Sequence, residues 1–136
     1  MSTITTNILA TNKTISNKNV TEVILPTLSG EIGLLPFHSR LVTGLEIGVL
    51  RLKINDKWCP YLILDGVAEI ADNNLKIISR QVEEVSDINM TVDEAKKEID
   101  IKNQELVNAK TKQEKILAAI NLRKASARYQ VLTMVN

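Results

Sequence analysis

Few side chains in this sequence of 136 residues could do chemistry on a substrate. His38 is the one histidine and Cys59 the one cysteine, and no pattern combines either of them with an activated serine. No second His or Cys stands at ligand spacing from His38, which argues against a metal site. We therefore expect no catalytic residue, no metal ligand and no cofactor, and a structural or interface role for His38.

Two pairs of adjacent carboxylates are the remaining candidates for acid–base chemistry. Glu83-Glu84 fits the solvated edge of a strand. Asp93-Glu94 fits the start of a helix, where acidic groups interact favourably with the helix dipole. The sequence also lacks a glycine-rich phosphate loop between a strand and a helix. The chain is therefore not expected to be an enzyme.

The basic side chains Arg123, Lys124 and Arg128 form a cluster near the C-terminal end. Residues 91–136 carry nine Lys/Arg and six Asp/Glu, whereas residues 1–90 carry eight and ten, so the C-terminal part is the basic one. Nucleic-acid binding is not expected, because neither stacking aromatic residues nor a dense basic stripe accompanies the cluster. Two alternatives remain open: a solvated helix face, or contact with an acidic partner.

A single cysteine excludes a disulfide within the chain, which is typical of a reducing compartment. No run approaches the ~20 apolar residues that span a bilayer. The segment Met1–Asn7 lacks the basic and then apolar pattern of a signal peptide. These features predict a soluble protein without a membrane span.

The elements that would position these groups fall into two parts with different periodicity. From Ile4 to about residue 85 the apolar residues alternate or form short β-branched runs, with turn residues every eight to twelve positions. This predicts an antiparallel β-sandwich of about ten short strands over residues 1–87. The predicted strands are Ile4–Ala10, Val20–Leu25, Ile32–Leu35, Leu41–Leu45, Val49–Ile54, Trp58–Leu64, Gly66–Ile70, Leu75–Ser79 and Val82–Val85.

Residues 88–136 predict an antiparallel helical hairpin, which gives an α+β fold overall. Thr91 and Glu94 form a capping box that predicts a helix start, and this helix is expected to reach about residue 108. A weak break is placed at residues 109–112, because a second apolar stripe is best buried by folding back on the first. That second stripe is Ile116, Ile120, Ala127 and Val131.

The stretch Ser29–His38 reads S-G-E-I-G-L-L-P-F-H and is the most specific motif in the chain. Its glycines permit conformations that other residues resist, and Pro36 fixes its own φ. Followed by Gly44, Gly48 and the helical hairpin, this string resembles the epsilon subunits of F-type ATP synthases. The resemblance covers essentially the whole chain and is closest to plastid and cyanobacterial members.

The resemblance implies a non-catalytic rotor subunit of a proton-translocating ATP synthase. Its sandwich would couple the gamma subunit of the central stalk to the membrane c-ring, and its hairpin would inhibit ATP hydrolysis. The implied contacts are Ser29, Gly30 and Glu31 with the c-ring, His38 with gamma, and Arg123, Lys124 and Arg128 with an acidic loop of the catalytic beta subunit.

Some bacterial members of the family bind ATP through an Ile/Leu-Asp-x-x-Arg-Ala string in the first helix. The matching positions here are 99–104, with Asn103 and Gln104 in place of Arg and Ala. This replacement removes the guanidinium fork that recognises phosphate, so ATP binding is not expected.

The resemblance further implies a peripheral protein on the stromal side of the plastid thylakoid membrane. A bacterial plasma membrane or a cyanobacterial thylakoid is the alternative location. A different class of function also stays open, namely a free-standing adaptor whose β-sandwich binds a peptide or ligand and whose hairpin makes a coiled-coil contact.

Overall fold

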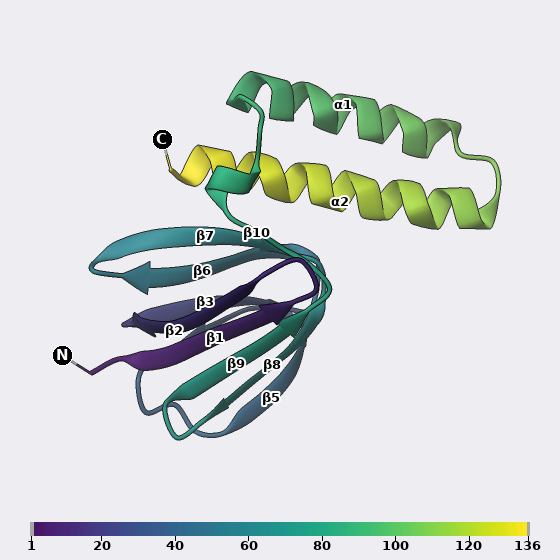
Figure 1. Ribbon diagram of the computed structural model, residues 1–136. Helices are drawn as coiled ribbons and strands as arrows, with labels where there is room; N and C mark the ends of the chain where they lie inside the picture. The colour runs from purple at the N-terminus through teal and green to yellow at the C-terminus, as the bar shows by residue number, and fades with distance from the viewer. Residues whose placement is uncertain (1, 136) are drawn as a thin grey trace.

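The computed structural model describes residues 2–135 as a two-layered β-sheet body and a pair of antiparallel helices, the second of which lies next to the sheet (Figure 1). This confirms the predicted α+β class. Within the described residues, the strands are β1 (Ile4–Ala10), β2 (Thr14–Val20), β3 (Glu22–Thr27), β4 (Gly30–Leu34), β5 (Leu41–Leu45), β6 (Gly48–Ile54), β7 (Lys57–Ile63), β8 (Gly66–Ala71), β9 (Asn74–Ser79) and β10 (Val82–Glu83). A short 3₁₀ helix, η1 (Val85–Asp87), precedes α1 (Val92–Asn108) and α2 (Lys112–Met134).

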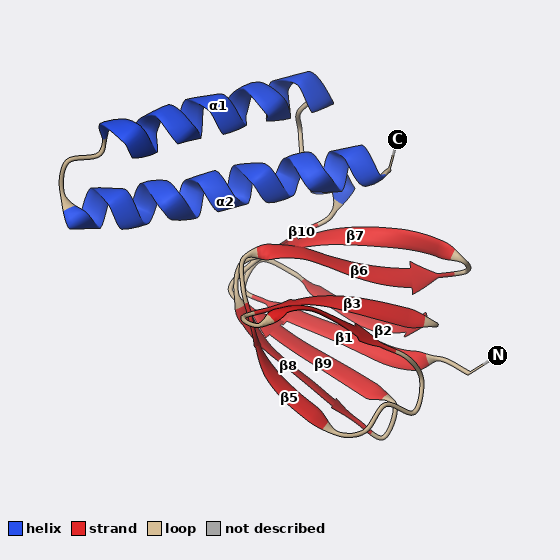
Figure 2. Ribbon diagram, turned by 180° about the vertical axis from the view of Figure 1, so that it is seen from behind, coloured by secondary structure: helices blue, strands red, loops and turns tan. Residues whose placement is uncertain are grey.

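The strands pair in the order β10-β7-β6-β3-β5-β8-β9-β1-β2, and β4 pairs with β3. Strand β3 links the two layers, because it pairs with β6 and, at Thr27 and Leu45 alone, with β5. Figure 2 shows β7 and β6 next to the helices, and β5, β8, β9 and β1 in the layer farther from them. The pair β1–β9 is parallel, so the expectation of a wholly antiparallel body is corrected at this point.

The core lies between the two layers and follows the alternation of the strands. Side chains at every second position of β1, β3, β6 and β9 point inward and are buried. Its largest fully buried members are Ile4, Ile8, Val20, Leu25, Leu34, Leu50, Leu52, Ile63, Ile70, Leu75 and Ile77. Dense packing of this kind makes the body stiff.

Strand β2 was missed by the sequence analysis, which predicted one strand from Val20 to Leu25. Five of its seven residues are exposed polar side chains, so it lacks an apolar alternation. Its two buried residues, Ile15 and Val20, stand five positions apart, an odd spacing that should place them on opposite faces. A register shift between Thr6 and Ile8 of β1 corrects the spacing and lets both point inward.

Both helices begin at a capping box. The Thr91 hydroxyl accepts a hydrogen bond from the Glu94 N–H at 3.1 Å, and the Glu94 carboxylate accepts one from the Thr91 N–H at 3.3 Å, as predicted. Thr111 and Glu114 repeat the arrangement at the start of α2. The break between the helices therefore lies within the predicted segment.

The hairpin contacts the body through one end of α2. Ala127, Val131 and Leu132 pack against Val49 of β6 and Leu62 of β7. The other end of the hairpin extends past the edge of the sheet in Figures 1 and 2. There the predicted stripe is wrong at its first residue, because Ile116 is 54% exposed instead of being buried against the first helix.

None of the described helices combines the length and the hydrophobicity needed to cross a membrane.

Candidate functional site

The predicted turn Ser29-Gly30-Glu31 joins β3 to β4 and is fixed by the buried Thr27. The Thr27 hydroxyl accepts a hydrogen bond from the Ser29 N–H at 3.2 Å and donates one to the Gly30 carbonyl oxygen. Gly30 has φ +108°, a conformation that residues with a Cβ rarely adopt. Leu28 precedes the turn with 69% of its side chain exposed. The turn is thus rigid at its base and open to a partner at its tip.

Glu31 reaches across β3 to the guanidinium of Arg51 on β6, with which it forms an ion pair. The Glu31 side chain is 61% exposed while the Arg51 side chain is mostly covered. The carboxylate is therefore oriented by the sheet and still accessible to a second donor.

His38 lies past the opposite end of β4 from the Ser29 turn. Five residues of extended chain separate these ends by roughly 14 Å. The His38 ring is half-buried, and its Nδ1 lies 2.7 Å from the Ser39 carbonyl oxygen. The fold therefore does not bring the two predicted contact points together.

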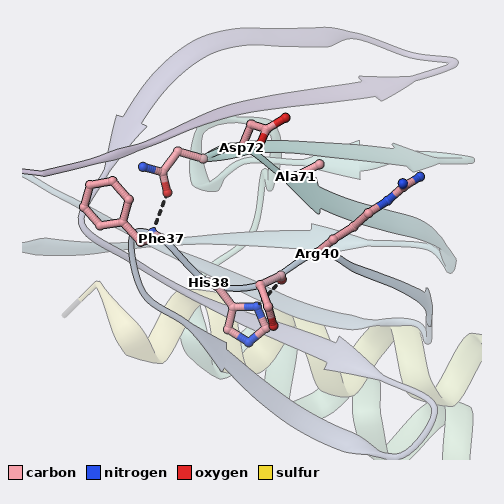
Figure 3. A pocket seen from close by; sticks show the side chains of 7 residues that line it. Phe37, His38, Arg40, Ala71 and Asp72 are labelled. Carbon is pink, nitrogen blue, oxygen red and sulfur yellow. Dashed lines mark hydrogen bonds between the residues drawn. The ribbon is translucent and has the colours of Figure 1, made fainter.

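The segment before His38 forms a tight turn. The His38 N–H donates to the Leu35 carbonyl oxygen at 3.2 Å, Pro36 occupies the second position, and Phe37 occupies the third with φ +69°. Next to it is an open hollow that Arg40, Ala71 and Asp72 also line, and Figure 3 shows Phe37 at one rim and Arg40 at the other.

An exposed apolar row crosses the outer face of the layer farther from the helices, and sequence reasoning missed it. Leu9, Ile78 and Val67 are paired in register across β1, β9 and β8, and they are 40, 52 and 48% exposed. Val67 is paired in turn with Gly44 of β5. The Leu28 side chain lies over Gly44, since a Cβ added there would be 3.2 Å from Leu28 Cδ1. Leu9, Ile78, Val67 and Leu28 are called the apolar row below.

Alternation could have indicated this row only in part. In β8 and β9 apolar residues occupy both faces, so the pattern does not separate the inward Ile77 from the outward Ile78. The register between strands decides which side chains align, and it is not readable from one sequence.

Of the predicted basic cluster, Arg128 is engaged within the chain. Its Nε and Nη2 donate to the two oxygens of Glu83 at 3.1 and 3.0 Å, a bidentate pair between α2 and β10. The Glu83 side chain is only 10% exposed. Hydrogen bonding to Glu83 raises the pKa of the Arg128 guanidinium above its ordinary value. Within residues 2–135, Arg123 and Lys124 have no ion-pair partner.

The junction between body and hairpin is held from the β1–β2 loop. The Asn12 side-chain amide donates to the Val82 carbonyl oxygen at 2.7 Å and accepts from the Val82 N–H at 3.0 Å. Lys13 pairs with Glu84 at 3.0 Å and with Asp87 at 2.6 Å. The Lys13 ammonium lowers the pKa of Asp87.

The positions that match the ATP-binding string form no cation fork. Lys102 pairs with Glu98 and Glu105 along α1, each at 3.5 Å, and Asn103 and Gln104 are exposed. In the described part of the chain, no group of three or more His, Cys, Asp or Glu side chains could hold a metal ion.

Three comparisons with known proteins agree on one family. Residues 3–85 match the family described as the ATP synthase, Delta/Epsilon chain, beta-sandwich domain. An ATP synthase epsilon chain, chloroplastic, from Porphyra purpurea is 40% identical over 131 residues, which covers 96% of each chain. A chain in the mitochondrial ATP synthase of Euglena gracilis, solved as OSCP/F1/c-ring, has a TM-score of 0.79 at 18% identity, with 99% of this chain and 82% of that chain covered.

A chain in the central stalk and c-ring of the Tetrahymena thermophila mitochondrial ATP synthase has a TM-score of 0.59 at 13% identity. The alignment covers 97% of this chain and 99% of that one. At these identities the two structures show the shared fold.

Proposed function

Because the chain belongs to the ATP synthase epsilon family, we propose that it is a non-catalytic subunit of the central stalk. In this proposal it couples gamma to the c-ring and restrains ATP hydrolysis. The proposed synthase is a proton-translocating one, and the proposed location is the stromal side of a plastid thylakoid membrane. Relatives named chloroplastic support the plastid. The observation that carries the proposal is the apolar row, which lies uncovered on the layer opposite the hairpin.

The gamma subunit docks on the apolar row. A contiguous set of large apolar side chains on a soluble chain is typical of a protein interface. Covering the exposed half of a side chain such as Ile78 stabilises a complex by ~1 kcal/mol, and here four members lie in a line. Coupling requires such a stiff attachment, because a yielding contact would dissipate torque between stalk and ring.

Ile78→Glu should weaken binding of the chain to a catalytic complex depleted of its epsilon subunit by roughly 30-fold, because ~1 kcal/mol of apolar contact is lost and a carboxylate without a partner costs about 1 kcal/mol or more at the interface. The thermal midpoint of the isolated chain should barely change, because Ile78 is 52% exposed. Titration followed by fluorescence anisotropy measures the affinity. Ile101→Glu is the matched control, because Ile101 is equally exposed but lies on α1. Equal affinities of both variants would exclude docking on the row.

The c-ring contacts the turn Ser29-Gly30-Glu31. The support is its geometry: the turn is pinned by Thr27, and the Glu31 carboxylate stays exposed after pairing with Arg51. A carboxylate held by one partner can accept further hydrogen bonds from polar loops of a neighbouring ring.

The hairpin regulates hydrolysis by exchanging between the body and the beta subunit. Its attachment is small, being one apolar cluster at the end of α2 and the Arg128–Glu83 pair. A few kcal/mol of partner contacts can shift such an equilibrium. Arg123 and Lys124 supply charges that meet acidic groups of beta, because neither is neutralised within residues 2–135.

Arg123→Glu with Lys124→Glu should relieve inhibition of ATP hydrolysis while proton-coupled synthesis continues. Two exposed ion pairs are worth about 1 kcal/mol together, so the ratio of inhibited to active enzyme should fall roughly fivefold. Hydrolysis and ATP synthesis are measured on reconstituted vesicles. Lys96→Glu with Lys97→Glu, on the exposed side of α1, is the control. Hydrolysis that stays inhibited to the same degree would remove the beta contact from the proposal.

Deleting the residues after Asp87 tests the regulation of hydrolysis less selectively than the point variants do, because the deletion also exposes the apolar side chains of Val49, Leu62 and Leu64. The point variants leave this cluster intact.

A further inference from the structure

Phe37 adopts a backbone conformation that is costly for its type. The turn Leu35–His38 has the hydrogen bond and the positive φ at its third position that match a type II turn, where glycine is the usual residue. A bulky residue at φ +69° is an outlier among protein residues. Such conformations persist where surrounding structure enforces them, and they are frequent at ligand clamps and binding sites.

Asn73 enforces this conformation from the neighbouring turn. Its Oδ1 accepts a hydrogen bond from the Phe37 N–H, drawn as a dashed line in Figure 3. Asp72 and Asn73 form the β8–β9 turn with φ +51° and +60°, and the Asn73 carbonyl oxygen also accepts from the Thr5 N–H at 2.9 Å. The Phe37 turn is therefore tied to two strands of the sandwich.

The strained turn does not serve the chain's own core. The Phe37 side chain is 76% exposed, which is more than any other exposed large apolar side chain of residues 2–135, and it is the only phenylalanine in the sequence. Folding gains nothing from holding this ring in solvent. A rigid, exposed aromatic ring is the type of side chain that dominates the energy of protein interfaces.

The surface next to Phe37 is continuous with the apolar row. Arg40 and Ala71 line the hollow beside the ring. Arg40 lies 3.7 Å from Glu69 of β8, and Glu69 is paired in register with Val42, which is 58% exposed on the same face as Gly44. Phe37, which follows the C-terminal end of β4, thus extends the outer face that carries the apolar row.

We infer that Phe37 is an aromatic anchor that inserts into an apolar pocket of the gamma subunit, and that Asn73 is its positioning residue. The inference rests on the proposed function and deepens it, because it names one dominant contact within the gamma interface. Arg40, whose side chain is 76% exposed, borders the anchor and suits a pocket with an acidic rim.

Phe37→Gly tests the anchor, because its effects on folding and on binding have opposite signs. Glycine relieves the positive φ, so the thermal midpoint of the isolated full chain should stay equal or rise. Affinity for the epsilon-depleted catalytic complex, which contains gamma but no c-ring, should fall about 30-fold or more. Phe37→Tyr keeps the ring and should bind within about threefold of the unchanged chain.

Asn73→Ala should reduce affinity less than Phe37→Gly and should add nothing to it in the double variant, because both act through the same ring. Unchanged affinity of Phe37→Gly alongside weakened Ile78→Glu would overturn the anchor and leave docking on the apolar row intact. Unchanged affinity of both would refute the docking face itself. A loss confined to vesicles that carry the c-ring would assign Phe37 to the ring instead and overturn the inference.

Discussion

Arg128→Met should lower the hydrogen-exchange protection of α2 by roughly 100-fold, because it leaves the buried carboxylate of Glu83 without a partner. Glu83 is 8% exposed, and removing one member of a buried ion pair costs about 3 kcal/mol or more. The loss should be confined to α1 and α2, since the sandwich has a separate core. Exchange measured by mass spectrometry on the full chain gives the result by segment.

Glu83→Leu combined with Arg128→Met is the control for charge burial. An apolar pair of similar volume removes the uncompensated carboxylate, so protection of α2 should largely return. Equal loss in the single and double variants would show that the packing of the Arg128 stem, and not its pairing with Glu83, holds the hairpin.

The Arg128–Glu83 pair predicts that substituting one partner or the other has different effects on the inhibition of ATP hydrolysis. The family resemblance implies that Arg128, like Arg123 and Lys124, contacts an acidic loop of beta. Adding this contact to the proposed regulation gives Arg128 two exclusive partners, Glu83 when the hairpin lies on the body and an acidic group of beta when it extends. Glu83→Gln frees Arg128 for beta and should strengthen inhibition, whereas Arg128→Met removes both contacts and should not. Equal inhibition by the two variants would mean that Arg128 has no role on beta.

The sequence predicted those parts of the fold whose signals are local. The capping box Thr91–Glu94 locates the start of α1, and Thr111–Glu114 carries the same signal for α2 at the predicted weak break. Two-residue loops such as Asn55-Asp56, both at positive φ, placed the reversals between strands.

The parts that were missed depend on pairing between distant residues. The ion pair between Arg128 and Glu83 joins positions 45 residues apart, and the sequence around either residue does not predict the pairing. The apolar row depends on the register of three strands, and the exposed end of the hairpin depends on where the sheet stops. Local periodicity contains none of this information.

Gly66→Ala should remove most of the stability of the body, with an expected loss above about 4 kcal/mol. Gly66 has φ +143°, and an added Cβ would lie 2.0 Å from the Ile78 carbonyl oxygen. That oxygen belongs to the backbone of β9, which is paired with β8 on one side and β1 on the other, so it cannot yield. Urea unfolding followed by circular dichroism measures the loss.

Gly33→Ala is the matched control, because the nearest atom to its added Cβ is the Val23 carbonyl oxygen at 4.0 Å. It should leave stability unchanged or raise it by about 0.5 kcal/mol through the reduced entropy of the unfolded chain. An unfolding midpoint for Gly66→Ala equal to that of the control would mean that β8 and β9 can separate without cost. Since Val67 and Ile78 of the apolar row stand on these strands, the body would then lack the stiffness that coupling requires.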